Sequence, residues 1–176
     1  GVSYWDNGTE YCHCVLNYGN YGTTSLQTNA RDLMKWMDNY RNPTICKPET
    51  LERMLWVPVL ESGQPTNYAC GLRVDKLDGR RYLKHAGEDA GFRAFVFRLL
   101  DEDVDVIIVA NTANTYTETA AYNIARIVLG EPAQIKAAPV PATDDFDEKT
   151  APGFYFSRIP DAFTLTVTEK NGVLYA

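Results

Sequence analysis

The chain has 176 residues, of which 45% are hydrophobic and 23% are charged, and these proportions are ordinary for a globular protein. Its formal net charge is -6 at pH 7 and it has no basic run, which argues against a nucleic-acid partner. No stretch approaches the roughly 20 apolar residues that a membrane span needs. We therefore expect one globular domain, or one domain and part of another.

The four cysteines, Cys12, Cys14, Cys46 and Cys70, leave two interpretations open. One disulfide joining the Cys12–Cys14 segment to Cys46 or Cys70 would suit a secreted protein, whereas free buried thiols are the alternative. The Cys12-His13-Cys14 run also resembles a metal ligand set. Structural zinc usually uses Cys-x-x-Cys spacing, however, so we expect no metal site.

The first 60 residues predict a loop followed by two helices. Residues 1–22 are rich in Tyr, Asn and Gly without a lasting period, which predicts a long ordered loop. Residues 29–40 predict a helix that Asn29 caps. Its apolar face is formed by Leu33, Trp36, Met37 and Tyr40. Pro48 opens a second helix, which ends before Pro58.

Antiparallel strands and a helix are predicted next. The strands are residues 68–74, 80–85, 92–99 and 106–110, and Asp78-Gly79 between the first two is a strong hairpin signal. The last two strands are apolar on both faces, which is typical of a sheet covered on both sides. A helix then starts at Asn114 or Thr115 and ends at Gly130.

The C-terminal part predicts a linker and a small β domain. Residues 131–151 combine three prolines with an acidic run, which indicates an extended spacer. From residue 152, apolar residues alternate at the strand period between turns at Pro160-Asp161 and Asn171-Gly172, which predicts a β-meander. A closed barrel of about eight strands needs more residues. We thus expect three parts: a domain over 1–130, a linker over 131–151, and a truncated β domain over 152–176.

The sharpest motif is His85-Ala86-Gly87 at the end of a strand, followed by Gly91-Phe92-Arg93 and by the apolar strand that leads into Asn111-Thr112. This layout resembles the C-terminal part of the serine β-lactamase and penicillin-binding-protein superfamily. It is most similar to the branch of β-lactamase-related esterases and D-aminopeptidases. Upstream, Gly22-Thr23-Thr24-Ser25 and the Ala-Arg-Asp-Leu run over 30–33 resemble a helix start of the same superfamily. The resemblance implies an α+β fold in which helices flank an antiparallel sheet.

The resemblance also implies which residues act. Members acylate a serine in a Ser-x-x-Lys motif, but no serine here has a lysine three positions later, so the nucleophile would lie outside this chain and the chain alone would be inactive. His85 would face the nucleophile and bind the substrate or the catalytic tyrosine. Gly87 would let the acyl group approach the strand. The backbone N–H of Glu88 would be the second oxyanion donor.

Two positions depart from the superfamily pattern, and one three-residue motif matches it by chance. His85 stands where the usual residue is Lys, and Ala86 stands at the substrate-binding position where Thr or Ser is usual. At pH 7 an imidazole binds a carboxylate less well than an ammonium does, so esters or neutral amides are favoured over β-lactams. Tyr18-Gly19-Asn20 matches the Tyr-x-Asn element formally, but it lies too close to the first helix to serve as that element.

Two functions remain open. The chain is either the C-terminal portion of a serine hydrolase that cleaves an ester, amide or β-lactam-type acyl bond through an acyl-enzyme, or a non-catalytic module of the same fold that binds a peptide or partner. No cofactor is expected. A partial fold would expose apolar surface, which predicts self-association or a second chain supplying the N-terminal part. We expect a periplasmic or secreted location, with the cytoplasm as the alternative.

Overall fold

The computed structural model describes residues 1–16, 19–20, 22 and 24–134 in full, together with the backbone of three strands between residues 153 and 175. The chain divides into two compact units, Gly1–Gln134 and Ile135–Ala176. The predicted linker over 131–151 lies outside the described residues from residue 135 onward. None of the helices in the described part is long and apolar enough to cross a membrane.

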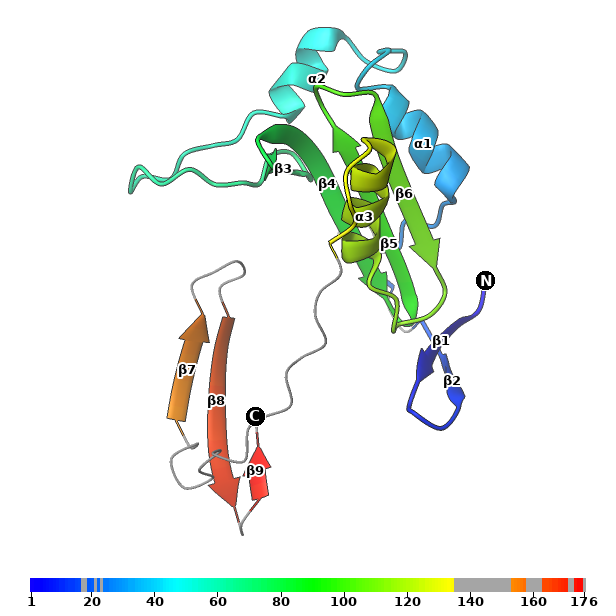
Figure 1. Ribbon diagram of the computed structural model, residues 1–176, viewed down its shortest axis with the longest axis vertical. Helices are drawn as coiled ribbons and strands as arrows, with labels where there is room; N and C mark the ends of the chain where they lie inside the picture. The colour runs from blue at the N-terminus through cyan, green and yellow to red at the C-terminus, as the bar shows by residue number, and fades with distance from the viewer. Residues whose placement is uncertain are drawn as a thin grey trace. The chain divides into compact units, whose positions relative to one another are not determined.

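The first unit is built on a four-stranded antiparallel sheet of order β3-β4-β5-β6 (Figure 1). Its strands are β3 Arg73–Leu77, β4 Arg80–Asp89, β5 Phe92–Leu99 and β6 Val104–Ala110. Asp78 and Gly79 link β3 to β4 with φ values of 51° and 84°. Positive φ at both central residues matches the right-handed twist of the strands, so the predicted hairpin is confirmed.

The strand predicted over 68–74 is wrong over residues 68–72, because β3 begins at Arg73. The chain reverses at a tight turn in which the Ala69 N–H donates to the Leu72 carbonyl at 2.8 Å, and Gly71 has a φ of 75°. Tyr68 therefore pairs back onto Arg73 in an isolated antiparallel bridge. Glycine accommodates this left-handed backbone without steric cost, so β3 can begin directly after the turn.

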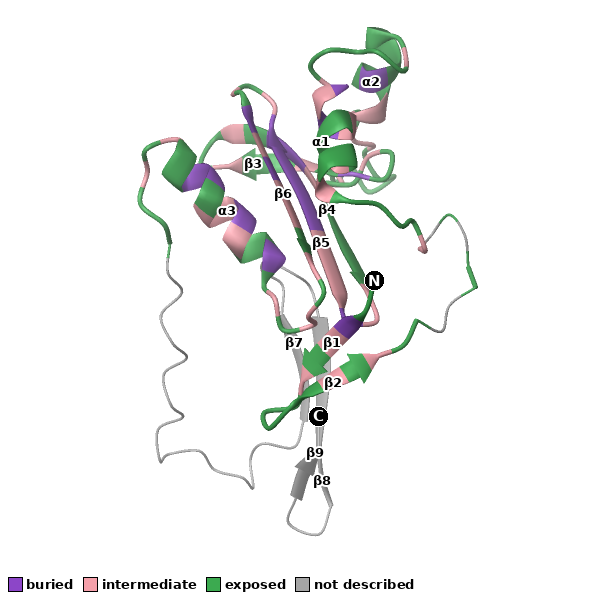
Figure 2. Ribbon diagram, turned by 90° about the vertical axis from the view of Figure 1, so that its right-hand side faces the viewer, coloured by how far each residue is buried: buried purple, intermediate pink, exposed green. Residues whose placement is uncertain are grey.

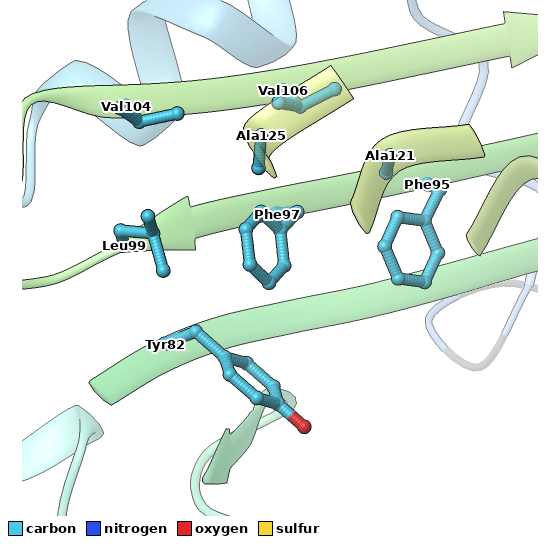
Figure 3. Close-up of a cluster of buried hydrophobic side chains, with 8 residues drawn as sticks. All are labelled: Tyr82, Phe95, Phe97, Leu99, Val104, Val106, Ala121 and Ala125. Atoms are coloured by element: carbon cyan, nitrogen blue, oxygen red, sulfur yellow. The ribbon is translucent and has the colours of Figure 1, made fainter. Parts of the chain in front are cut away.

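One helix covers each face of the sheet, as Figure 2 shows. Helix α1, Ala30–Asp38, is capped by Asn29, whose side chain accepts the Asp32 N–H, and helix α2, Pro48–Met54, follows it. The buried cluster on the α1 face consists of Met37, Leu72, Leu83 and Val96. Helix α3, Thr117–Val128, packs on the other face. The cluster there, drawn in Figure 3, consists of Tyr82, Phe95, Phe97, Leu99, Val104, Val106, Ala121 and Ala125.

A buried ion pair fastens α1 to the sheet. Arg98 of β5 lies opposite Asp105 of β6, with 2.7 Å between the guanidinium and the carboxylate and 4% and 8% of the two side chains exposed. Arg98 also donates to the carbonyl of Met37 at 3.2 Å. Arg41, just after α1, donates to the same Asp105 carboxylate at 3.1 Å. Each buried charge is thus paired, as burial of a charge requires.

A polar network holds α3 to the opposite face. Lys84 of β4 pairs with Glu118 and donates to the Tyr122 hydroxyl at 2.8 Å. That hydroxyl donates to Glu118 at 2.6 Å. Burial raises the pKa of Glu118, but the hydrogen bonds from Lys84 and Tyr122 outweigh burial and hold that pKa below its usual value. Burial and the bond to Glu118 raise the pKa of Tyr122.

The predicted loop over residues 1–22 is wrong, because it contains a β-hairpin of β1, Ser3–Asp6, and β2, Tyr11–Cys14. The Asn7 side chain accepts the N–H groups of Thr9 and Glu10, which closes the turn. Asn114 accepts the Asp6 N–H at 2.8 Å. Because Asn114 binds β1 in this way, α3 begins at Thr117 rather than at Asn114 or Thr115.

All four cysteines are free thiols, so the disulfide interpretation is wrong. Cys12, Cys14 and Cys46 are partly buried and Cys70 is exposed, so the thiols are not fully buried either. Within the described residues, His, Cys, Asp and Glu side chains form no cluster of three or more that would hold a metal ion.

The second unit is an antiparallel meander. It consists of β7 Gly153–Ser157, β8 Phe163–Lys170 and β9 Val173–Tyr175 in the order β7-β8-β9. Each strand pairs with the next one in the sequence. The meander predicted from the alternating residues is confirmed, because the period of 2 places these residues in extended backbone.

Candidate active site

The second half of β4 is an open sheet edge, and the His85-Ala86-Gly87 motif lies on it. The pairing of β4 with β3 ends at the pair Arg73↔Lys84, whereas its pairing with β5 continues to Asp89↔Phe92. Residues 85–89 are therefore paired on one side only, within the part of the chain that the structure describes. His85, Ala86, Gly87 and Glu88 are all exposed there.

The register decides which backbone groups point out of this edge. In an antiparallel pair, alternate residues turn their N–H and C=O groups toward the partner strand. The Arg81 carbonyl accepts from Leu100 on the β5 side at 2.8 Å, and the register continues without a bulge to Asp89. Odd-numbered residues of β4 thus bond to β5. The N–H and C=O groups of Ala86 and Glu88 consequently face the open edge.

The side chains of the motif divide between the two faces of the sheet. Because side chains alternate along a strand, His85 and Gly87 share the α1 face with Leu83, and Ala86 and Glu88 share the α3 face with Lys84. The Glu88 carboxylate lies 3.8 Å from Arg93 and its side chain is 71% exposed. Its negative charge is therefore on the face opposite to His85.

Gly87 is not required by the protein's own packing. A Cβ built there would lie 3.5 Å from the Cβ of Ala94, an ordinary van der Waals contact. Its φ is outside the left-handed range that favours glycine. What an added side chain would change is the space above the exposed edge, which the glycine leaves open.

Tyr68 is the residue at this site that the sequence interpretation missed. Its hydroxyl lies 3.2 Å from Nε2 of His85, and the two ring centroids are 6.3 Å apart. Nothing in the sequence pattern indicates this contact, because the two residues are joined through the turn before β3.

A second contact connects the upstream motif to the same strand. The Thr24 hydroxyl donates to the Asp89 carboxylate at 3.0 Å. The other Asp89 oxygen is buried without a hydrogen-bond partner among the described residues. Thr24 and the end of β4, which are far apart in sequence, are therefore neighbours.

Comparison with known proteins identifies the family. The β-lactamase family matches residues 3–129, which is well over half of the chain. The chain belongs to the β-lactamase family. The assignment predicted from the His-x-Gly strand and its surroundings is thus confirmed, and it places the chain in a family of serine hydrolases.

Two curated relatives and one solved structure agree with this assignment. A D-aminopeptidase of Gluconobacter oxydans is 30% identical over 112 residues, 63% of this chain and 21% of the relative. A D-aminopeptidase of Cereibacter sphaeroides is 26% identical over 121 residues, 67% of this chain and 23% of the relative. This β-lactamase-family chain therefore spans less than a quarter of either protein.

The solved structure is the octameric penicillin-binding protein homologue from Pyrococcus abyssi. It has a TM-score of 0.66 and 16% sequence identity, and the alignment covers 98% of this chain and 48% of that chain. At this identity the likeness establishes the fold alone. The predicted fold class, a partial β-lactamase-like α+β fold followed by a β-meander, is confirmed.

Proposed function

We propose that this chain is the C-terminal portion of a serine hydrolase and that the open edge of β4 forms the oxyanion side of its acyl-transfer site. In this proposal the nucleophile of the Ser-x-x-Lys motif lies in sequence outside the 176 residues. The substrate is attacked on the α1 face, where His85 projects, and passes through an acyl-enzyme. The chain alone is inactive.

The observation that carries the proposal is the outward-facing N–H of Glu88. A donor that points at developing negative charge is worth about 10²–10³ in rate. This N–H lies on a strand fixed by eight consecutive residue pairs with β5, so it needs no reorganisation when charge develops. Gly87 beside it leaves space for the acyl group to approach.

An ester or a neutral amide fits the site best as substrate. No Lys or Arg stands at the His85-Ala86-Gly87 motif, so the motif offers no permanent positive charge to a substrate carboxylate. The carboxylate of Glu88 lies on the other face of the sheet. The two relatives are D-aminopeptidases, which favours an amide bond next to a D-amino acid.

Labelling with a fluorophosphonate, which reacts with activated serines, tests where the nucleophile lies. Intact-mass analysis of the 176-residue chain should show no adduct, and the protein that also contains the preceding sequence should acquire one. An adduct on the 176-residue chain would show that a nucleophile is present in it. No adduct on either protein would favour the alternative function, a non-catalytic module that binds a peptide or partner.

Replacement of Glu88 by proline tests the oxyanion donor directly. Proline lacks the N–H and is tolerated on an open strand edge, so Glu88→Pro should slow acylation of the longer protein by about 10²–10³. Lys76→Pro is the matched control, because Lys76 is exposed on the outer side of edge strand β3. Equal rates for the two variants would contradict the proposed donor.

A further inference from the structure

We infer that Tyr68 is a positioning residue, whose hydroxyl orients the His85 imidazole beside the open edge of β4. The inference rests on the proposed function and deepens it, because it specifies which nitrogen of His85 is available to substrate. The Tyr68 hydroxyl lies 3.2 Å from Nε2 of His85. This is within the range of a hydrogen bond between an oxygen and a ring nitrogen.

The backbone around Tyr68 is fixed on both sides. The Val74 N–H donates to the Asn67 carbonyl at 2.9 Å, and Tyr68 forms a bridge with Arg73. Before it, the Thr66 hydroxyl and N–H both donate to the Pro58 carbonyl, at 2.9 Å and 3.1 Å. Tyr68 is thus anchored to β3, the same strand that pairs with the first half of β4.

His85 has little else to hold its ring. Its side chain is exposed, and within the described residues the Tyr68 hydroxyl is the hydrogen-bond partner of its ring. The next residue on its face toward the open end of the strand is Gly87, which has no side chain to pack against it. An exposed imidazole without a partner would sample several rotamers, so the bond to Tyr68 selects one of them.

The bond also distinguishes the two ring nitrogens. Because Nε2 is engaged by Tyr68, Nδ1 is the nitrogen left to bind a substrate atom or the catalytic tyrosine. The Tyr68 hydroxyl can donate to Nε2 or accept from it, so the bond orients the ring in either tautomer and leaves Nδ1 open to the other group. Tyr68 therefore acts on the reaction through His85 and not by contact with the substrate.

Nitrogen NMR of the histidine rings tests the bond in this chain itself. The chain contains only two histidines, so His13 is an internal reference. Tyr68→Phe keeps the ring and removes only the hydroxyl, and it should shift the ring nitrogen resonances of His85 while those of His13 stay unchanged. Tyr116→Phe, at a tyrosine that is 83% exposed, should shift neither. Unchanged His85 resonances in Tyr68→Phe would overturn the inference.

Kinetics of the longer protein test the role. Tyr68→Phe should lower kcat/KM by up to about 10²-fold, the cost of misplacing a reacting group by about 1 Å, and Tyr116→Phe should leave it unchanged. In a His85→Ala background, Tyr68→Phe should cause no further loss, because it acts through His85. A full further loss there would overturn the inference. Absence of all acyl transfer, with the expected nitrogen shifts, would instead overturn the proposed function and leave the bond in place.

Discussion

At the scale of single residues, Gly91 joins the N-terminal hairpin to the sheet by close backbone contact. A Cβ at this position would lie 2.5 Å from the carbonyl oxygen of Tyr4 and 2.7 Å from its nitrogen, and the Gly91 N–H donates to the Ser3 hydroxyl at 3.1 Å. Since the obstructing atoms are backbone, they cannot rotate away. Only glycine allows β1 to pack against the β4–β5 turn.

We therefore expect Gly91→Ala to destabilise the protein by about 1–3 kcal/mol, the usual cost of overpacking. Gly87→Ala is the matched control, because its Cβ would meet Ala94 at an ordinary 3.5 Å and should change stability little. Urea unfolding of the two variants and the wild type measures the difference. Equal midpoints for Gly91→Ala and Gly87→Ala would show that β1 moves aside without cost.

At the scale of elements, the contact between α3 and β4 depends on pH through Glu118. Its folded-state pKa is below the usual value, so the carboxylate stabilises the fold above its unfolded-state pKa. That contribution is lost as the pH falls through the lowered folded-state value. Glu118→Gln should consequently be less stable than the wild type at neutral pH. The difference between their free energies of unfolding should disappear as the pH falls.

Urea midpoints measured across the acid range test this expectation. The control is Glu61→Gln, since Glu61 is exposed and belongs to none of the ion pairs of the described residues. The urea midpoint of this variant should change with pH in the same way as that of the wild type. A gap between Glu118→Gln and the wild type that stays constant down to strongly acidic pH would contradict a role for the charge.

The elements that the sequence predicted correctly are those whose signals are local. Asn29 caps α1, and Asp78-Gly79 forms the predicted turn, because both depend on neighbouring residues alone. The hairpin at residues 3–14 was missed because its two strands are only four residues each and too short to show a period.

The motif names candidate residues for the site but not their geometry. The sequence predicted a strand that ends at His85, whereas β4 continues to Asp89. The outward direction of the Glu88 N–H depends on the register that runs to the pair Asp89↔Phe92. The contact of Tyr68 with His85 could not be predicted for a different reason. Tyr68 meets His85 only because the turn at Ala69–Leu72 folds the chain back, and no periodicity reports such a turn.

At the scale of the whole molecule, the chain exposes many large apolar side chains. On α3 these include Ile124, Ile127 and Val128, with exposed fractions of 42%, 61% and 64%. Outside the helices, Trp56 and Leu26 are exposed by 68% and 85%. Ile124, Ile127 and Val128 follow the i, i+3, i+4 spacing of one helix face, and contiguous exposed apolar surface of that kind favours association with other protein.

We expect the isolated chain to self-associate, with a sedimentation coefficient that rises with protein concentration because association buries apolar surface. Sedimentation velocity over a wide concentration series measures this. Raising the salt concentration should not dissociate the self-associated chains, since salt screens charges but does not weaken apolar contacts. A monomer at every concentration would contradict the expectation.

The outward-facing edge of β4 has a consequence for how such a site can diversify. A backbone N–H is supplied by every residue type except proline, so the group proposed to stabilise the oxyanion does not depend on which side chain occupies position 88. That side chain is free to be acidic, as Glu88 is here, or to change with the substrate. Single substitutions along this strand can therefore change the substrate preference while the proposed donor stays the same.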